Sequence, residues 1–440
     1  MAQVSQKFHA KLFKEASKLL TNYDDYKQYC VNEKDFTRNR ELSFQTVVLV
    51  ILQLLKSSVK TELKSYYKTV FKVDEVVNWV SDAAFCKARQ KVKHQFFIDI
   101  YKFIARFFYR HIGGKLWFHF RLLAVDGSEI NLPSSKELLN KFGVHHTNSI
   151  GTKIPQARIS FLFDALNNIT IDAQIESFKV GEQQMFTEHL LSIGKNDLLT
   201  ADANYGHFRI LRAIEQTGAD FCVRMSQSSN FIKDFLASKA KDTIIEWIPS
   251  KATKVNCIKH DIDFSPLKIR LVRIDLSETE TEVLALSLLD QKIYSYEKVK
   301  DLYDKRWKVE EEIKKFMQRL LVEFFSSIKE NGVLQDFYAN IFMLNLVSFI
   351  AEPVHEQIYK ASENCKYRQQ INWTSALGDV RGRLVLLFKR SLNKIDSIIK
   401  SFWDSFKKNT EAIKPDRKFP RDKRKKGARQ KAFMNYKPAW

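Results

Sequence analysis

The chain has 440 residues, 45% of them hydrophobic, and is long enough to bury a large core in two or three packed units. Its formal net charge of +21 at pH 7 favours a polyanionic partner, with a merely solvated basic surface as the alternative. Five widely spaced cysteines, with no Cys-x-x-Cys pair, argue against a disulfide framework or a zinc site and favour a reducing, intracellular compartment.

The N-terminal part, up to about Gly114, has helical periodicity. Apolar residues return every three or four positions in three segments, residues 8–20, 43–58 and 95–112. The start of the chain lacks the apolar region of a signal peptide, and the apolar run from Val47 to Leu55 is too short to cross a bilayer. We therefore expect a helical N-terminal unit, with no secretion and no membrane span.

The pattern then changes to that of an α/β unit. The apolar run at residues 116–127 predicts a first strand, and Asn167-Asn168 is a pair suited to the tight turn between the next two strands. A helix, a strand, a helix and a strand are predicted next, at residues 182–193, 197–202, 207–218 and 220–225. The predicted order is β-β-β-α-β-α-β.

Residues 227–294 alternate again between apolar and polar side chains. They predict an all-β insertion with four strands, at residues 243–249, 254–264, 267–277 and 282–289. Helices resume near Tyr296 and continue through two long segments, residues 337–359 and 392–408. From Lys414 to Lys431 there are ten Lys or Arg against two Asp and no apolar period, which predicts a mobile basic tail.

Residues 303–316, YDKRWKVEEEIKKF, predict a helix with three successive glutamates. At about 100° per residue, one face of this helix carries Tyr303, Arg306, Glu310 and Lys314. Glu310 and Lys314 could form an ordinary stabilising helix pair, or Glu310 could be one of several carboxylates around a magnesium ion. Glu312 points to the opposite side, and Trp307 is interpreted as core packing.

Two more carboxylates end predicted strands. Asp126 ends the strand RLLAVD, and Asp202 ends LLTAD. Ligands gather at strand ends of α/β sheets, and carboxylate oxygens are the ligands that magnesium prefers. Each residue also has a simpler interpretation, because Asp126-Gly127 is a turn signal and Asp202 could cap the next helix. Asp164 and Asp172, which flank the Asn-Asn turn, rank below them as hairpin residues.

Three blocks of this sequence resemble the signature blocks of bacterial insertion-sequence transposases of the DDE class, in the branch with a Tyr-Arg-Glu-Lys helix motif. They are VDGSEINLP around Asp126, ADANYG around Asp202, and Y-x2-R-W-x2-E from Tyr303 to Glu310. Their order and their spacing (202 − 126 = 76, then 310 − 202 = 108) make the combination specific. The lysine usual seven residues after the glutamate is replaced by Met317.

The resemblance implies an α/β protein with a ribonuclease-H-like catalytic core, a β-rich insertion, and helical N-terminal and C-terminal regions. The implied domains are a helical DNA-binding domain at 1–115, the first part of the core at 116–226, the β-rich insertion at 227–294, the end of the core at 295–330, a helical region at 331–413 and the basic tail at 414–440.

The resemblance also implies the chemistry. Asp126, Asp202 and Glu310 would be catalytic and would hold two Mg²⁺ ions, for which Mn²⁺ substitutes. The implied DNA-binding residues are Tyr303, Arg306 and Lys314. In such a transposase, one site cleaves the end of the element, forms a hairpin, reopens it and joins the end to target DNA.

The implied partners are double-stranded DNA, both the terminal inverted repeats and the target, and a second copy of the chain in a synaptic homodimer. A bacterial cytoplasmic protein, associated with the nucleoid when bound to DNA, is expected. The basic residues of CKARQKVKH, namely Lys87, Arg89, Lys91 and Lys93, could recognise the element ends or form a solvated helix flank. An inactive DNA-binding relative and a magnesium nuclease without joining activity are the alternative functions.

Overall fold

The computed structural model describes residues 2–38, 40–55, 57–73, 80–144, 153–276 and 280–414. The chain divides into two units. The helical unit comprises Met1–Gly113, Ile130–Ala157 and Lys314–Trp440, and the sheet unit comprises Gly114–Glu129 and Arg158–Ile313. From residue 415 on, the predicted basic tail lies outside the described residues. The division into six functional segments stays a prediction.

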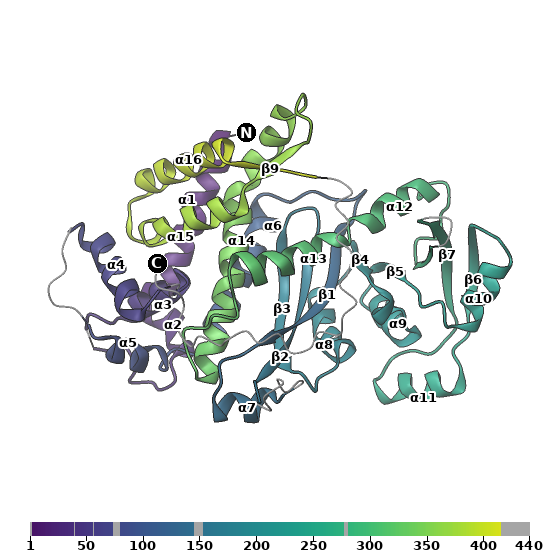
Figure 1. Ribbon diagram of the computed structural model, residues 1–440, viewed down its shortest axis with the longest axis horizontal. Helices are drawn as coiled ribbons and strands as arrows, with labels where there is room; N and C mark the ends of the chain where they lie inside the picture. The colour runs from purple at the N-terminus through teal and green to yellow at the C-terminus, as the bar shows by residue number, and fades with distance from the viewer. Residues whose placement is uncertain are drawn as a thin grey trace. The chain divides into compact units, whose positions relative to one another are not determined.

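A single mixed sheet organises the α/β part. Among the described residues it has eight strands, in the order β3-β2-β1-β4-β5-β8-β7-β6 (Figure 1). They are β1 (Arg121–Asn131), β2 (Gln156–Asp164), β3 (Ile169–Ser177), β4 (Asp197–Ala201), β5 (Asp220–Arg224), β6 (Asp242–Trp247), β7 (Leu267–Asp275) and β8 (Thr281–Leu286). The strands β1, β4 and β5 are parallel, and β8, β7 and β6 continue the sheet in antiparallel pairs. The α/β class predicted from the sequence is confirmed.

The turn between β2 and β3 forms as predicted. Asn168 has a φ of 54°, in the left-handed region that asparagine tolerates better than most residues. The Oδ1 atom of Asp164 accepts hydrogen bonds from the backbone N–H groups of Leu166 (2.9 Å) and Asn167 (3.0 Å). Asp164 is therefore a turn-forming residue, as its position beside the Asn-Asn pair indicated.

The segment 227–294 is only partly as predicted. Three of its four predicted strands correspond to β6, β7 and β8, but they extend the main sheet and are joined by two helices, α10 (Asn230–Ala237) and α11 (Lys251–Lys259). The strand predicted at residues 254–264 is wrong. The side chain of Ser250 accepts a hydrogen bond from the N–H of Thr253 and starts α11, so a local cap prevailed over an alternating apolar pattern.

The sheet unit contains four further helices. They are α8 (Glu182–His189), α9 (Phe208–Gln216), α12 (Tyr296–Asp304) and α13 (Trp307–Lys314), whose last residue belongs to the helical unit. Val299 and Leu302 of α12 pack in one buried cluster with sheet residues such as Leu198 and Leu284. Because each such side chain contributes about 1.5–3 kcal/mol on burial, this packing fixes α12 on the sheet just before α13.

The helical unit contains the three helices predicted near the N-terminus. Its helices are α1 (Ala2–Thr21), α2 (Tyr23–Tyr26), α3 (Phe44–Leu52), α4 (Val59–Phe71), α5 (Asp82–Arg89), α6 (Gln95–His111), α7 (Lys136–Phe142), α14 (Glu330–Ala361), α15 (Trp373–Lys389) and α16 (Leu392–Lys408). A two-stranded sheet pairs β9 (Gln369–Ile371) with β10 (Thr410–Ala412). The helix α16 spans the residues predicted for it.

The helix α14 is the centre of the helical unit. Among the described residues it is the one helix long and apolar enough to cross a membrane by length and composition, a feature that the sequence prediction overlooked. Its apolar stretch is 100% buried inside the structure, as in the core helix of a soluble protein. Figure 1 shows it passing through the helices of this unit, where it packs on α6, α3 and α16.

Candidate active site

The register of two parallel strands brings Asp126 and Asp202 to the same level. In β1 and β4, Arg121 pairs with Asp197, an offset of 76 (197 − 121) that holds through the paired positions. Continued along β1, the same offset places Asp126 beside Asp202, the residue that directly follows β4. Adjacent strands are about 4.8 Å apart, and residues level with each other point to the same face. The sequence spacing of the two aspartates is therefore a strand register.

The opposite ends of these strands are held by an ion pair. The Nε atom of Arg121 donates to Oδ1 of Asp197 and its Nη2 atom donates to Oδ2, both over 2.7 Å. This two-pronged pairing fixes the register at the start of the strands. Because Asp126 lies five residues further along β1, an odd number (126 − 121), its side chain is on the other face of the sheet.

The Asp126-Gly127 pair is not a turn. The strand β1 continues to Asn131, and a Cβ atom on Gly127 would lie only 3.1 Å from the carbonyl oxygen of Ile159 in β2. Gly127 therefore permits a close backbone approach inside the sheet. The Oδ1 atom of Asp126 accepts a hydrogen bond from the N–H of Gly127 over 2.8 Å.

Asp202 does cap the segment that follows it. Its Oδ1 atom accepts a hydrogen bond from the N–H of Asn204 over 2.9 Å, at the start of a short 3₁₀ turn, Ala203–Tyr205. Asp202 therefore caps this turn and not the predicted helix, α9, whose N-cap is His207; the bond uses one oxygen of the carboxylate and leaves the other for a further ligand.

The helix predicted over residues 303–316 is broken. The helix α12 ends at Asp304 and α13 begins at Trp307, while the N–H of Arg306 donates to the carbonyl of Tyr303 over 3.0 Å in a tightened turn. The prediction of one continuous helix was therefore wrong, but Arg306 still lies beside Glu310 and Tyr303. The Nη2 atom of Arg306 donates to Oε1 of Glu310 over 3.0 Å, and its Cζ lies 5.5 Å from the ring centre of Tyr303.

The charges of Glu310 and Asp202 act on the carboxyl group of Asp126. Burial raises the pKa of Asp126 to about 6, and the negative charges of Glu310 and Asp202 add to this effect, opposed by the N–H of Gly127 and by Arg306. A carboxyl group with a raised pKa beside two other carboxylates indicates a place where positive charge would be favourable.

The donor set fits a magnesium site, but its arrangement does not close around an ion. Within residues 2–414, masked positions excepted, no group of three or more His, Cys, Asp or Glu side chains is placed so that it could hold a metal. Like charges repel one another, and Glu310 takes the guanidinium of Arg306 as its counter-ion. The chemical type of these side chains nevertheless suits Mg²⁺, because carboxylate oxygens are ligands that Mg²⁺ prefers.

The other predicted site residues are placed as follows. Tyr303 is 5% exposed, and its hydroxyl donates to the carbonyl of Ala201 over 3.5 Å. Lys314 is exposed and belongs to the helical unit. Trp307 is 45% exposed, so its interpretation as a core residue is wrong; its ring lies 4.9 Å from Cζ of Arg306. Tyr303 thus supports Arg306 from within the core.

Sequence reasoning missed a cation in the same row. In β5, Val223 pairs with Ala201 of β4, so Arg224 is level with Asp202, by the same offset of 22 (223 − 201 and 224 − 202). The Nη1 atom of Arg224 donates to Oε1 of Glu282 over 2.6 Å. The arginine at the end of DFCVRM was visible in the sequence, but its register with Asp202 was not.

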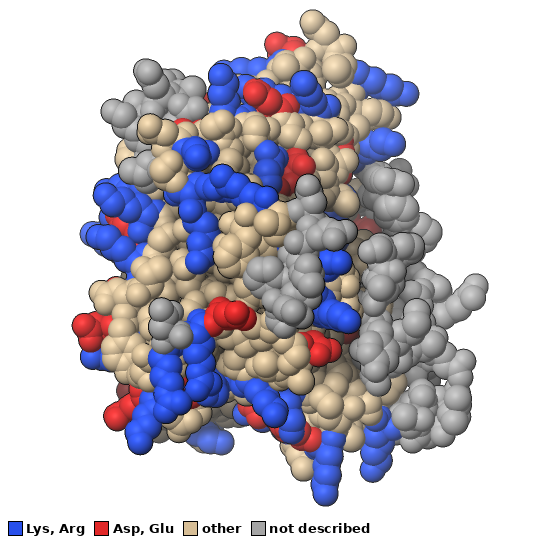
Figure 2. All heavy atoms as spheres, turned by 90° about the vertical axis from the view of Figure 1, so that its left-hand side faces the viewer, with Lys and Arg blue, Asp and Glu red and all other residues tan. Residues whose placement is uncertain are grey.

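The basic segment in the N-terminal unit is only partly a surface. Arg89 is 1% exposed and pairs with Asp336, so it cannot belong to a DNA-recognition surface, and that part of the prediction is wrong. Lys87 is exposed, Lys91 pairs with Asp35 over 2.9 Å, and Lys93 donates to a backbone carbonyl. The face drawn in Figure 2 carries more Lys and Arg than Asp and Glu.

Three parallel central strands with carboxylates at their adjacent ends define an α/β protein with a candidate ligand site at the carboxyl edge of its sheet. The model of the transposase DDE domain family matches residues 117–346. This range is more than half of the chain, so the chain belongs to the transposase DDE domain family, whose catalytic domain has a ribonuclease-H-like fold.

A solved structure is also similar to the chain. It is the cryo-EM structure of the piggyBac transposase synaptic complex with hairpin DNA, at 11% sequence identity and a TM-score of 0.40, covering 90% of this chain and 81% of that one. The comparison with curated proteins gives no match.

Proposed function

We propose that this chain is a DNA transposase that moves a bacterial insertion sequence by cut and paste, with Asp126, Asp202 and Glu310 as its catalytic acids. The observation that carries the proposal is the convergence of these carboxylates within the family domain. Asp126 and Asp202 come from level positions on parallel strands, and the charges of Asp202 and Glu310 both act on Asp126. The Tyr-Arg-Glu-Lys branch and the hairpin intermediate are parts of the same proposal.

Members of this family depend on divalent metal ions. In our proposal Asp126, Asp202 and Glu310 hold two Mg²⁺ ions, for which Mn²⁺ can substitute. When bound, the ions supply activation of the attacking hydroxyl and stabilisation of the leaving oxygen. To take part, Glu310 exchanges its ion pair with Arg306 for a ligand role, and the guanidinium becomes available to a DNA phosphate.

The chain's own cations orient the DNA strand. Two arginines lie near the acids: Arg306 pairs with Glu310 and Arg224 pairs with Glu282. Arg224, held by Glu282, presents its remaining N–H groups to phosphate oxygens as a fixed fork, and Arg306 does so once Glu310 has released it. The ring of Tyr303 orients Arg306, and the hydroxyl of Tyr303 donates a hydrogen bond to the carbonyl of Ala201 in β4. Lys314 adds a further phosphate contact.

The proposed substrates are the terminal inverted repeats of the element and a target duplex. Two copies of the chain hold the paired ends in a synaptic complex. The exposed Lys87, Lys91 and Lys93 contribute to end recognition, and the net charge of +21 provides the general attraction to DNA.

The test uses purified protein, Mg²⁺ and DNA with the inverted repeats that flank the coding sequence. Asp126→Ala, Asp202→Ala and Glu310→Ala should each reduce cleavage by about 10²-fold or more, since each removes a group that stabilises transition-state charge, and should retain DNA binding. The matched control is Glu311→Ala, whose side chain is 53% exposed on the same helix. Glu312 is fully buried and would be a poor control.

The products decide between this function and its alternatives. Hairpin or joined ends support a transposase. Simple nicks without joining would identify a magnesium nuclease, and retarded but intact DNA would identify an inactive DNA-binding relative. Full cleavage by Glu310→Ala would contradict the assignment of the third acid.

A further inference from the structure

A chain of hydrogen-bonded polar side chains is buried within the sheet unit. Nε2 of His189, the last residue of α8, lies 2.9 Å from Oγ of Ser160 in β2. The carboxylate of Asp172 in β3 accepts a hydrogen bond from Nδ1 of His189 over 2.7 Å. Nε2 of Gln174 also donates to Oδ2 of Asp172, over 3.3 Å. Two strands and a helix are therefore joined by one set of hydrogen bonds.

Three of these side chains have the connectivity of a nucleophilic triad, in which a carboxylate orients the imidazole and the imidazole activates the hydroxyl. Ser160 and His189 are 0% exposed and Asp172 is 6% exposed, so a substrate cannot reach the hydroxyl. The set is therefore not a hydrolytic site. A buried, mutually bonded set of this kind is rigid, and it is suited to hold other groups in place.

The chain extends from Ser160 to the turn that follows Asp202. Oγ of Ser160 is also the hydrogen-bond partner of the Tyr205 hydroxyl. Tyr205 is the last residue of the turn, is 1% exposed and packs on Phe186 of α8, with ring centres 5.4 Å apart. The preceding residue, Asn204, is exposed. Tyr205 therefore anchors the turn in the core.

Two backbone N–H groups of this turn bind Asp202. The N–H of Asn204 donates to its Oδ1 atom over 2.9 Å, and the N–H of Tyr205 donates to its carbonyl oxygen over 3.1 Å. Any displacement of Tyr205 therefore moves the groups that orient the carboxylate of Asp202.

The hydroxyl of Tyr205 also lies within electrostatic reach of the acids. Burial, followed by the negative charges of Glu182, Asp126 and Asp202, raises its pKa well above the ordinary value. The hydroxyl therefore stays protonated at neutral pH and keeps its hydrogen bond to Ser160. Tyr205 thus connects the buried chain with the surroundings of both aspartates.

We propose that this buried chain positions Asp202 for the reaction. Its linked members, Ser160, His189 and Tyr205, are positioning residues, because they act on the carboxylate through the turn. The inference rests on the proposed function, since it requires that Asp202 is a catalytic acid. Precise placement matters because a displacement of about 1 Å in a reacting group can slow a reaction about 100-fold.

The first test is hydrogen exchange in the full chain without DNA or metal. Ser160→Ala removes the central link, whereas Tyr205→Phe removes only the terminal hydroxyl and keeps the ring that packs on Phe186. In both variants the amides of residues 204 and 205 should exchange about fivefold faster, as expected for the loss of one ordinary hydrogen bond. Exchange at the wild-type rate in both variants would overturn the inference.

The matched control is Ser287→Ala in the same unit. The hydroxyl of Ser287 donates to Oδ1 of Asp220 over 2.7 Å and accepts from the N–H of Phe221 over 2.9 Å, at the start of β5. This variant should leave the exchange of the turn and the rate of DNA cleavage at wild-type values. Equal effects of Ser287→Ala and Ser160→Ala would indicate a general loss of stability and contradict the inference.

The second test is single-turnover cleavage of inverted-repeat DNA in Mg²⁺, with the protein in excess. The rate constant then depends on the geometry of the folded molecules, and the amplitude depends on their number. Ser160→Ala and Tyr205→Phe should each lower the rate constant about tenfold or more at unchanged DNA affinity. The double variant should lower it no further, because both changes break one chain. A lower amplitude with an unchanged rate constant would show a merely structural role and contradict the inference.

The two tests separate this inference from the proposed function. If the wild type cleaves repeat DNA and both variants cleave it at the same rate, only the positioning role is disproved. If the wild type cleaves none, the proposed function fails, and hydrogen exchange still decides whether the buried chain holds the turn.

Discussion

The carboxyl group of Asp126 is placed where its ionised form is disfavoured. Burial and two neighbouring carboxylates, Glu310 and Asp202, raise its pKa from 3.8 to about 6, and the N–H of Gly127 and the guanidinium of Arg306 only partly offset them. A group whose pKa is higher in the folded than in the unfolded chain destabilises the fold once it is ionised. A divalent cation bound at this site would neutralise the negative charge of its carboxylates.

Asp126→Asn should stabilise the metal-free protein at neutral pH. The wild type should lose stability as the pH rises from about 4 to about 6, and the amide variant should not, which gives a difference of at most about 3 kcal/mol above pH 6. Urea unfolding in EDTA at several pH values measures it. Equal stability of both proteins at pH 7 would contradict the electrostatic picture, and added Mg²⁺ should reverse the order.

The sequence was enough to propose the three acids one by one, but it did not reveal their partners. Asp126 and Asp202 follow strand patterns that the sequence displays, and Glu310 falls in a recognisable motif. Arg224 comes level with Asp202 through strand register, which no local sequence pattern reveals. Arg89 shows the opposite error, because a cation in a basic stretch proved to be a buried structural residue.

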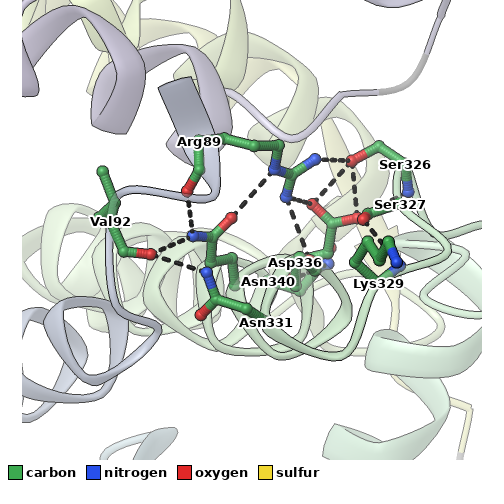
Figure 3. A network of polar contacts seen from close by, with 10 residues as sticks. Arg89, Val92, Ser326, Ser327, Lys329, Asn331, Asp336 and Asn340 are labelled. Atoms are coloured by element: carbon green, nitrogen blue, oxygen red, sulfur yellow. Dashed lines mark hydrogen bonds and ion pairs between the residues drawn. The ribbon is translucent and has the colours of Figure 1, made fainter. Parts of the chain in front are cut away.

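At the scale of elements, Arg89 joins the end of α5 to the start of α14 (Figure 3). Its guanidinium donates to Oδ1 of Asp336 (3.1 Å), Oε1 of Gln335 (3.0 Å), Oγ of Ser326 (2.8 Å) and the carbonyl of Gly332 (3.1 Å). The side chains of Arg89 and Asp336 are 2% and 7% exposed. A buried ion pair with this many hydrogen bonds specifies one packing of the two helices.

Arg89→Ala should destabilise the helical unit by about 3–5 kcal/mol, because Asp336 would be left buried and unpaired. Chemical denaturation measures the change. The control is Lys87→Ala on the exposed side of α5, which should change stability by less than about 0.5 kcal/mol. Adding Asp336→Ala to Arg89→Ala should cost little more, since the uncompensated charge is then gone, whereas fully additive losses would contradict the ion pair.

The errors in element prediction have local causes. Residues 254–264 alternate as a strand does, but Ser250 caps a helix there. The helix motif around Glu310 has a continuous helical period, but a tightened turn at Lys305–Arg306 divides it into α12 and α13. Periodicity averages over ten or more residues and cannot register a single cap or turn.

For the whole molecule, the net charge of +21 should dominate association with DNA. Residues 415–440 carry ten Lys or Arg and two Asp, so without them the net charge would be +13 (21 − 10 + 2). Affinity for DNA falls with salt in proportion to the number of phosphates neutralised, with a slope of about −0.9 for each phosphate contact.

A chain ending at Lys414 should therefore bind DNA with a shallower salt dependence. The slope of log affinity against log salt should decrease by several units, up to about 9 if all ten cations contact phosphates. Fluorescence anisotropy with duplex DNA from about 50 to 200 mM salt measures it. An unchanged slope would show that the tail makes no phosphate contacts, and Mn²⁺ binding serves as a control that truncation should not alter.

The sequence by itself determined which residues can carry the chemistry and the order of most elements, because apolar periodicity, caps and turn residues act over a few neighbouring positions. Tertiary structure decided which of those residues meet. The register between β1 and β4, the level placement of Arg224 with Asp202 and the burial of Arg89 against Asp336 all depend on contacts between distant segments. Such contacts are set by packing and long-range charge, which have no local signature in the chain.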